Sequence, residues 1–242
     1  MGRLYCRNRR LVLIILTGAS GGIGQELIPH LAKLDRVIGI YNSSKPKLES
    51  EPNVTYVQLN LANPKDVENF IETWKVELNK LKNLTVVHLA AAKKDGLVVN
   101  YSEKDWDLLM QVNLKAAFSL TKYLLPIMIK IGYGRNIFTS SRGALDGDVG
   151  AIAYSTSKAG ILGLSKVLAK EYARFNITSN VLLLGTFETG MFNKLSTKSQ
   201  QEIIKKIPSK KCGNIDNIAN AIDFCIKSDY VSGSVIAIDG AM

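Results

Sequence analysis

Tyr154 and Lys158 are the pair of side chains whose types and spacing most directly suggest acid–base chemistry. They lie four residues apart within residues 151–175, a segment of helical period, so both project from one face of the expected helix. A phenol with a pKa of about 10 is a poor acid–base catalyst at neutral pH unless a nearby ammonium favours the phenolate. We therefore expect Lys158 to lower the pKa of Tyr154, which would then exchange a proton with a carbonyl or alcohol oxygen. The alternative interpretation is an exposed pair on an amphipathic helix.

A hydroxyl and an amide precede this pair at positions that could complete a catalytic site. Ser141 lies thirteen residues before Tyr154, just after the expected strand 136–140, where its hydroxyl can hydrogen-bond a reacting oxygen. Ser140 competes for this role, because successive strand residues point to opposite sides of a sheet. The spacing to Tyr154 favours Ser141. Asn113 by itself is typical of a helix bend or a helix cap.

A glycine-rich turn lies near the start of the chain and reads T-G-A-S-G-G-I-G over residues 17–24. It follows an apolar run directly and opens a helical pattern, which is where a parallel sheet binds a dinucleotide. Gly18 allows the tight turn, Gly22 lets the backbone approach a pyrophosphate, and Gly24 permits close helix packing. Free amides at the helix start attract phosphate charge. The context favours a cofactor site over a simple turn.

These residues would be positioned by short apolar strands that alternate with longer helices, a pattern typical of βαβ units and a parallel sheet. Seven strands are expected, at residues 11–16, 36–41, 54–59, 84–89, 136–140, 178–184 and 234–238. Crossover helices are expected at residues 23–34, 64–81, 102–131 and 151–175. The prediction is one domain over residues 1–242, an α/β doubly wound (Rossmann) parallel seven-stranded sheet with helices on both faces. The irregular stretch 185–213 is either a lid or a surface helix on a loop.

The glycine spacing G-x-x-x-G-x-G, the Y-x-x-x-K of residues 154–158, Ser141 and Asn113 occur in the order found in the short-chain dehydrogenase/reductase superfamily. The ending, residues 232–240, also resembles the last strand of that family. Within the superfamily, the chain is most similar to the 3-oxoacyl-[acyl-carrier-protein] reductase-like group. The resemblance implies a catalytic tetrad of Asn113, Ser141, Tyr154 and Lys158, with Asn113 supporting a proton relay. It also implies a homo-oligomer, a tetramer or a dimer.

The resemblance also assigns residues that would bind a nicotinamide dinucleotide. Tyr154 and Lys158 would lie beside the nicotinamide, and Lys158 would hold its ribose. The other implied contacts are Gly18, Ser20, Gly22, Ile23, Gly24, Asn42, Asn60, Ala90 and Thr189. Three positions depart from the family pattern: His88-Leu89-Ala90-Ala91 stands for N-N-A-G, Asn60 for an acid, and Leu184-Gly185 for Pro-Gly. No second ligand is spaced with His88, so no metal site is expected.

The choice of cofactor depends on the end of the second expected strand, where an Asp or Glu would accept the ribose hydroxyls of NAD. Tyr41 and Asn42 provide no acid there, and Ser43, Ser44 and Lys45 could bind a phosphate. NADP is therefore the preferred cofactor, with NAD as the alternative. A solvated polar turn would have the same composition. The glycine loop also has Gly21 where many NADP-using relatives have a basic residue.

Composition limits the partners. The formal net charge is +10, but basic residues stand singly or in pairs, so a solvated surface explains the charge better than nucleic acid does, with an acidic substrate or carrier as the alternative. The longest apolar run, residues 11–16, is far shorter than the roughly 20 residues of a membrane span. The arginines before this run, together with the run itself, resemble the charged and apolar regions of a signal peptide, but the resemblance ends at Thr17. Three cysteines without C-x-x-C spacing suggest neither disulfides nor zinc and favour the cytoplasm.

The sequence therefore predicts an NAD(P)H-dependent carbonyl reductase or alcohol dehydrogenase, acting on a small-molecule or acyl-carrier-bound carbonyl and using Asn113, Ser141, Tyr154 and Lys158. A cofactor-binding regulator or partner subunit with the same fold is the first alternative, and the altered segment 88–91 is its support. A sugar-nucleotide epimerase is the second. Its substrate domain would need more chain after Lys158 than is present.

Overall fold

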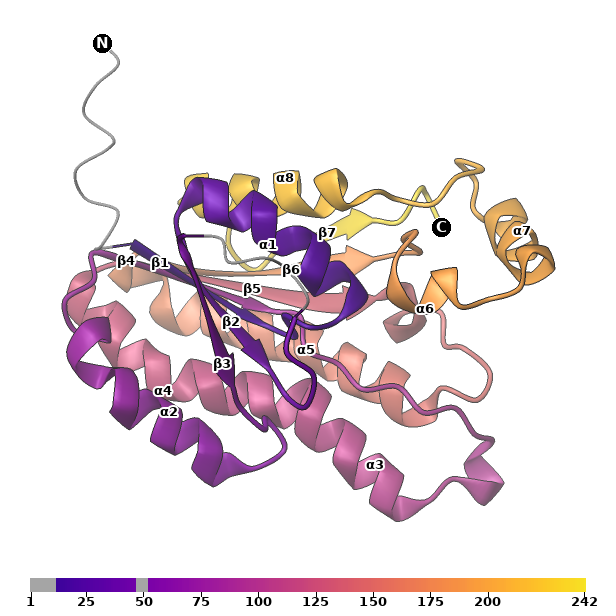
Figure 1. Ribbon diagram of the computed structural model, residues 1–242, viewed down its shortest axis with the longest axis horizontal. Coiled ribbons are helices and arrows are strands. Elements are labelled where there is room, and N and C mark those ends of the chain that lie inside the picture. The colour runs from indigo at the N-terminus through magenta and orange to yellow at the C-terminus, as the bar shows by residue number, and fades with distance from the viewer. Residues whose placement is uncertain (1–11, 47–51) are drawn as a thin grey trace, which may run out of the picture.

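Seven parallel strands form one sheet in the order β3-β2-β1-β4-β5-β6-β7 in the computed structural model, which describes residues 12–46 and 52–242 (Figure 1). The strands are β1 (Val12–Thr17), β2 (Arg36–Tyr41), β3 (Val54–Gln58), β4 (Asn83–His88), β5 (Gly134–Ser141), β6 (Ile177–Leu184) and β7 (Val235–Ile238). Every predicted strand is present, with its ends within two residues of the prediction where they can be compared. Leu11, expected to begin the first strand, lies outside the described residues.

Helices cover both faces of the sheet, with α1 and α8 on one side and α2, α4 and α5 on the other (Figure 1). The helices are α1 (Gly22–Leu34), α2 (Pro64–Leu78), α3 (Glu103–Met110), α4 (Ala116–Ile131), α5 (Ile152–Tyr172), α6 (Gly190–Asn193), α7 (Thr197–Lys206) and α8 (Ile215–Lys227). The predicted doubly wound parallel sheet is confirmed. None of the helices in the described ranges has the length and apolar character needed to cross a membrane.

Two helical regions differ from the prediction. The helix expected over 102–131 is divided, because a π-helical turn at Gln111–Lys115 separates α3 from α4. Helix α8 was not predicted, although Asn214 forms a capping box with Asn217 at its start. Residues 185–213 contain α6 and α7, so a helix on an irregular connection is present there. Phe192 of this stretch packs with Ile207 and Cys212 in a small apolar cluster of its own.

The core explains why β1 is almost continuously apolar. Leu13 and Ile15 of β1 pack into the cluster beneath α2, α4 and α5, whereas Ile14 and Leu16 pack into the cluster beneath α1 and α8. Successive strand residues point to opposite faces, and here both faces are covered by helices. Burial on both sides fixes the position of β1 and therefore of the glycine turn that follows it.

The order of the strands reverses between β1 and β4. The chain leaves β1 toward β2 on one side and leaves β4 toward β5 on the other, so a crevice opens between the carboxyl ends of these two strands. Thr17 ties the two ends together, because its Oγ1 accepts hydrogen bonds of 3.1 Å from the backbone N–H groups of Leu89 and Ala90. The glycine turn therefore lies at the topological switch point, the position where such sheets bind ligands.

Candidate active site

Ser141 and Tyr154 are brought together at the carboxyl edge of the sheet. Ser141 is the last residue of β5, and its hydroxyl is close enough to the Tyr154 phenol to lower the pKa of that phenol. The Ser141 Oγ also accepts a hydrogen bond of 3.3 Å from the backbone N–H of Gly143. Ser140 points the other way, where its Oγ donates to the Lys158 carbonyl at 2.8 Å and connects β5 to α5. Of the two serines, Ser141 is the one that faces Tyr154.

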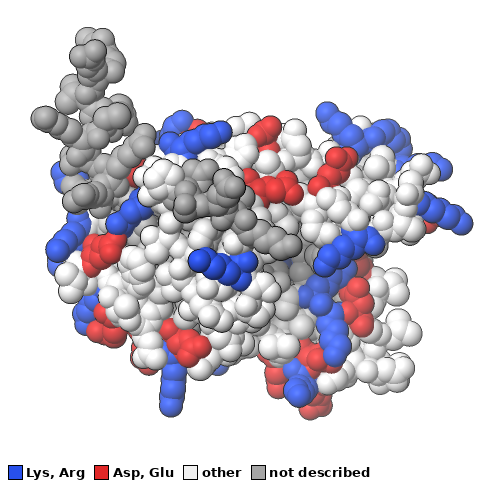
Figure 2. Space-filling model, in the orientation of Figure 1, with Lys and Arg blue, Asp and Glu red and all other residues white. Residues whose placement is uncertain are grey.

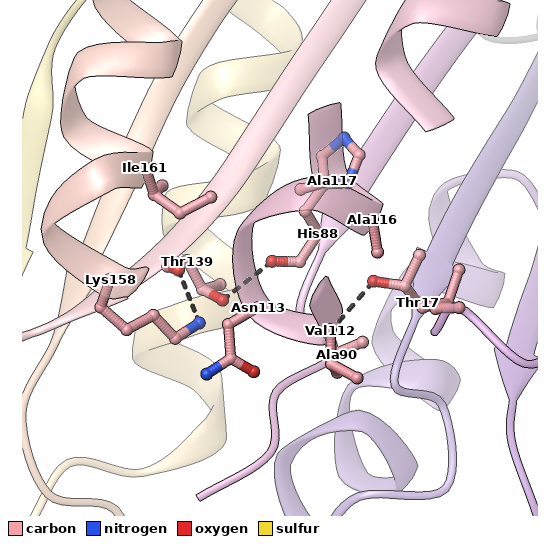
Figure 3. A pocket seen from close by; sticks show the side chains of 11 residues that line it. Thr17, His88, Ala90, Val112, Asn113, Ala116, Ala117, Thr139, Lys158 and Ile161 are labelled. Atoms are coloured by element: carbon pink, nitrogen blue, oxygen red, sulfur yellow. Dashed lines mark hydrogen bonds between the residues drawn. The ribbon is translucent and has the colours of Figure 1, made fainter. Parts of the chain in front are cut away.

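Lys158 lies one turn after Tyr154 on α5 and is buried. Its ammonium donates a hydrogen bond of 2.9 Å to the Thr139 carbonyl, and the Thr139 Oγ1 donates to the His88 carbonyl at 2.8 Å (Figure 3). Burial lowers the pKa of Lys158 from its usual value of 10.5 to about 8. Close to neutral pH, this side chain is therefore an ammonium that readily gives up its proton.

The pKa of Tyr154 is raised above its usual value of 10.0. Burial of the phenol is the largest cause, the hydrogen bond from Ser141 acts in the opposite direction, and the carboxylate of Asp148 raises the pKa further. This direction is opposite to the one that the sequence predicts. The physical reason is that burial dominates, while the ammonium of Lys158 is held at the Thr139 carbonyl. A raised pKa keeps the phenol protonated, the form that can donate a proton to a carbonyl oxygen.

Asn113 lies in the π-helical turn between α3 and α4, and its amide is fully engaged. Its Oδ1 accepts from the Ala92 N–H at 2.7 Å, while its Nδ2 donates to the Ala92 carbonyl and to the Ser157 Oγ, each at 3.0 Å. Ser157 in turn donates to the carbonyl of Tyr154 at 2.8 Å. Asn113 therefore connects the segment after β4 to the turn of α5 that carries Tyr154.

The burial of Lys158 predicts a distinctive dependence of stability on pH. Its pKa is about 8 in the folded chain and 10.5 when exposed, so between these values the unfolded chain holds more protons and rising pH stabilises the folded protein. Relative to a Lys158→Met variant, the wild type should gain up to roughly 3 kcal/mol of unfolding free energy across this window. Urea unfolding at a series of pH values measures the difference. Lys166→Met, which alters an exposed lysine of the same helix, should leave the wild-type slope unchanged. A difference in unfolding free energy between wild type and Lys158→Met that stays constant across the pH series would contradict the prediction.

The glycine turn has the geometry that a pyrophosphate requires. Gly18 has φ +75°, and a Cβ there would lie 2.8 Å from the Ala90 Cα. A Cβ on Gly24 would lie 2.2 Å from the Gly18 carbonyl oxygen. The N-cap of α1, Gly21, supplies no side-chain hydrogen bond, and the first turn contains no acid. The first amides of α1 thus point their N–H groups out of the helix without a competing carboxylate, which suits a dinucleotide phosphate.

The other residues expected to contact a cofactor are distributed along the same edge of the sheet. Thr189 approaches the glycine turn, since its Oγ1 lies 3.1 Å from the position of a Cβ on Gly22. Ala90 lies beside Thr17, and Asn42 and Asn60 are exposed just beyond β2 and β3. The Asn60 Oδ1 accepts from the Ala62 N–H at 3.0 Å. Ser20 and Ile23 belong to the glycine turn itself and are partly buried. The structure places these residues along one edge of the sheet, with Thr189 and Ala90 next to the glycine turn.

His88, which the sequence analysis noted as a departure from a family pattern and did not place in the site, is part of the site's support. Its ring stacks on Phe138 with centroids 4.5 Å apart, and its Nε2 lies 3.1 Å from the Thr121 Oγ1. In Figure 3 the ring extends toward α4, while the Lys158 ammonium and the Asn113 amide point into the same space. A cavity of about 10 Å³, roughly the space that one water molecule requires, is lined by His88, Asn113 and Lys158 among others. Burial lowers the pKa of His88 to about 3, and Lys158 contributes to the shift.

Sequence reasoning also missed Thr17, Thr139 and Asp148. Thr17 and Thr139 act through hydrogen bonds to or from backbone groups of distant parts of the chain, and the spacing of residues in the sequence does not predict such contacts. Asp148 lies in the connection before α5, where its charge reaches Tyr154. Its position six residues before the tyrosine was the available signal.

Comparison with known proteins identifies the family. The family model described as short chain dehydrogenase matches residues 12–200. The chain belongs to this family. It is therefore an NAD(P)-dependent oxidoreductase by family, and the resemblance to the 3-oxoacyl-[acyl-carrier-protein] reductase-like group is confirmed by its relatives.

Two curated relatives illustrate this similarity. Nodulation protein G of Rhizobium sp. (strain N33) is 34% identical over 235 residues, covering 94% of this chain and 95% of that protein. The 3-oxoacyl-[acyl-carrier-protein] reductase FabG of Rickettsia felis is 34% identical over 236 residues, with the same coverage of 94% and 95%. Among solved structures, a short chain dehydrogenase family protein from Francisella tularensis superposes with a TM-score of 0.82. It is 21% identical and covers 95% of this chain and 98% of its own, which shows the shared fold.

Proposed function

We propose that this short-chain dehydrogenase reduces the 3-oxo group of an acyl thioester carried by an acyl carrier, with NADPH as the preferred cofactor. The observation that carries the proposal is that the hydroxyls of Ser141 and Tyr154 face each other at the same sheet edge as the glycine turn. Several relatives are named 3-oxoacyl-[acyl-carrier-protein] reductase, and they supply the choice of substrate. The naming of others as nodulation protein G does not specify one.

The residues divide the work of the reaction. A bound nicotinamide cofactor supplies the hydride that the carbonyl carbon receives. The Tyr154 hydroxyl gives its proton to the carbonyl oxygen, which becomes the hydroxyl of a secondary alcohol. The Ser141 hydroxyl holds that oxygen beside Tyr154. Lys158 holds the ribose of the cofactor, and Asn113 positions the helical turn that carries Tyr154.

The charge of the protein supports an acidic carrier. The formal net charge is +10, which attracts an acidic partner over long distances. On the face shown in Figure 2, Lys and Arg are interspersed with Asp and Glu, and several Lys or Arg side chains stand out over the region of α7. That helix carries Lys198, Lys205 and Lys206, all exposed. The proposal retains the expected homo-oligomer, in support of which Phe118 of α4 is 47% exposed and Val167 of α5 is 53% exposed.

The direct test is to mix the purified protein with NADPH and an acetoacetyl thioester and to follow the absorbance of the reduced nicotinamide. The expected result is thioester-dependent loss of this absorbance and formation of the 3-hydroxyacyl product. Carrier-bound substrate should react with a lower KM than the same acyl group on a small thiol. Absence of turnover with either thioester, in both directions and with both cofactors, would overturn the proposed function.

Cofactor preference rests on the turn after β2, and Lys45→Glu should reverse it. The turn is exposed and contains Ser43, Ser44 and Lys45 but no carboxylate. A phosphate on the adenosine ribose would be favoured by the ammonium and repelled by a glutamate, which could instead accept the ribose hydroxyl. NADPH should bind more tightly than NADH to the wild type, and the ratio of the two Kd values should shift by about tenfold or more in the variant.

Titrations that follow nicotinamide fluorescence at fixed ionic strength measure these constants. Lys33→Glu makes the same charge change on an exposed residue of α1, and it should keep the wild-type ratio. If the wild type prefers NADH, or if Lys45→Glu leaves the ratio of the two Kd values unchanged, Lys45 does not recognise the ribose phosphate and the predicted NADP preference is wrong.

A further inference from the structure

The carboxylate of Asp148 stands over the turn that carries Ser141. Its Oδ2 is 2.6 Å from the position that a Cβ on Gly143 would occupy, so it nearly touches this glycine. The backbone N–H of Gly143 is in turn hydrogen-bonded to the Ser141 Oγ at 3.3 Å. The Asp148 carbonyl accepts from the Ala151 N–H at 3.0 Å at the start of α5, which fixes the backbone here. The negative charge of Asp148 is thus held close to the Ser141 hydroxyl, with Gly143 between them.

This charge is not neutralised by the cation closest to it in sequence. Arg142 is engaged elsewhere, with its Nε and a terminal nitrogen donating to Asp146 at 3.1 and 3.0 Å and another nitrogen 3.6 Å from an Asp239 oxygen. Within residues 12–46 and 52–242, Asp148 forms no ion pair and its carboxylate accepts no hydrogen bond. Its effect on the pKa of Tyr154 indicates that its field reaches the reacting hydroxyl.

A cation faces Tyr154 from another element, but it has its own partner. The Lys93 ammonium lies 5.8 Å from the centroid of the Tyr154 ring and 3.6 Å from an Asp95 oxygen. Lys158, on the same helix as Tyr154, donates to the Thr139 carbonyl. Among the charged groups described around Tyr154, Asp148 is therefore the one whose side chain has neither a hydrogen-bond partner nor an ion-pair partner.

Exposed apolar side chains lie in the two segments next to this carboxylate. Val149 and Leu145 lie in the same connection and are strongly exposed, and Val98 and Val99 are exposed on the short helix Val98–Asn100 after β4. A backbone hydrogen bond of 2.8 Å from the Gly96 N–H to the Gly150 carbonyl holds these two segments together. The segments next to Ser141 and Tyr154 thus present exposed apolar side chains together with the carboxylate of Asp148, a combination that favours an uncharged acyl group.

We propose that Asp148 determines specificity at this site by excluding substrates that carry a negative charge next to the reacting carbonyl. The protein would then accept 3-oxoacyl groups as thioesters, esters or amides and reject free 3-oxo acids. This inference rests on the proposed function, because it assumes that Ser141 and Tyr154 hold a carbonyl oxygen. Like charges a few ångströms apart at a partly wet surface repel strongly enough to change relative rates about tenfold.

The experiment compares acetoacetate with ethyl acetoacetate, which present the same ketone with and without a carboxylate. Both are assayed with the wild type, Asp148→Asn and Asp148→Glu. We expect the wild type to favour the ester, and we expect the ratio of kcat/KM for acid over ester to rise about tenfold in Asp148→Asn. Asp148→Glu keeps the charge and should keep the low ratio. Added salt should reduce the difference between wild type and Asp148→Asn.

Asp229→Asn is the matched control, because it removes an exposed carboxylate beyond the far end of α8, and it should leave the ratio at its wild-type value. An unchanged ratio in Asp148→Asn, or an equal rise in Asp148→Glu, would overturn the role of Asp148 while leaving the proposed function intact. If the wild type reduces neither the ester nor a thioester, the proposed function fails and this inference fails with it.

Discussion

Replacement of Tyr154 by Phe should lower kcat for carbonyl reduction by at least about a thousandfold, which corresponds to roughly 4 kcal/mol of lost transition-state stabilisation. The substitution removes one hydroxyl, the group that faces Ser141 and would give its proton to the substrate oxygen. The ring remains, so its packing and the course of α5 should be preserved. Affinity for the cofactor should stay within about twofold, because the removed oxygen serves the reacting carbonyl.

Steady-state rates and cofactor titrations on the same preparations test this expectation. Tyr172→Phe removes a hydroxyl near the far end of the same helix and should retain wild-type turnover. Lys158→Ala should differ from Tyr154→Phe by weakening cofactor binding as well as turnover. Retention of more than a tenth of the wild-type kcat in Tyr154→Phe would exclude Tyr154 as the proton donor.

The parts of the fold that the sequence predicts best are those whose pattern is set by burial alone. The central strands are buried between two helical layers, so the apolar runs that predict β1 and β4 follow directly from burial on both faces. The division of the 102–131 helix could not be predicted in this way. It depends on the π-helical turn around Asn113, which exists because the amide of that residue bonds to Ala92 and Ser157, groups distant in the sequence.

Helix α8 is a different case, because its signal was present and overlooked. Ile218, Ala219, Ile222 and Cys225 repeat at helical spacing and are buried, and Asn214 begins the helix with a capping box. The predictions about the candidate site were likewise correct in one respect and wrong in another. The Y-x-x-x-K spacing predicts that Tyr154 and Lys158 share one face of α5, and they do. The direction of the Tyr154 pKa was wrong, because spacing along a helix says nothing about how deeply the phenol is buried or where the ammonium is held.

His88 should make the protein unusually sensitive to acid. Its pKa is about 3 in the folded chain and 6.5 when exposed, so between these pH values the histidine binds a proton in the unfolded chain but not in the folded chain. Folding stability therefore falls as the pH drops below 6.5, by up to roughly 5 kcal/mol over the whole window. The cause is burial of the ring against Phe138 and α4, with the Lys158 ammonium opposing a second positive charge. A His88→Asn variant cannot take up this proton and should lose roughly 2 kcal/mol less than the wild type between pH 6.5 and about pH 4.5.

Urea unfolding of both proteins across this range measures the difference in slope, which is independent of any constant penalty that the substitution causes through lost ring stacking. The chain has one other histidine, His30, which provides the matched control. Its ring is partly exposed, with its Nδ1 3.7 Å from an Asp216 oxygen, and His30→Asn should retain the steep acid dependence of the wild type. Parallel pH profiles for wild type and His88→Asn would mean that the buried ring accepts a proton in the folded state. In that case the contacts with Thr121 and Phe138 would have to rearrange in acid, and His88 would not be the group that ties stability to pH.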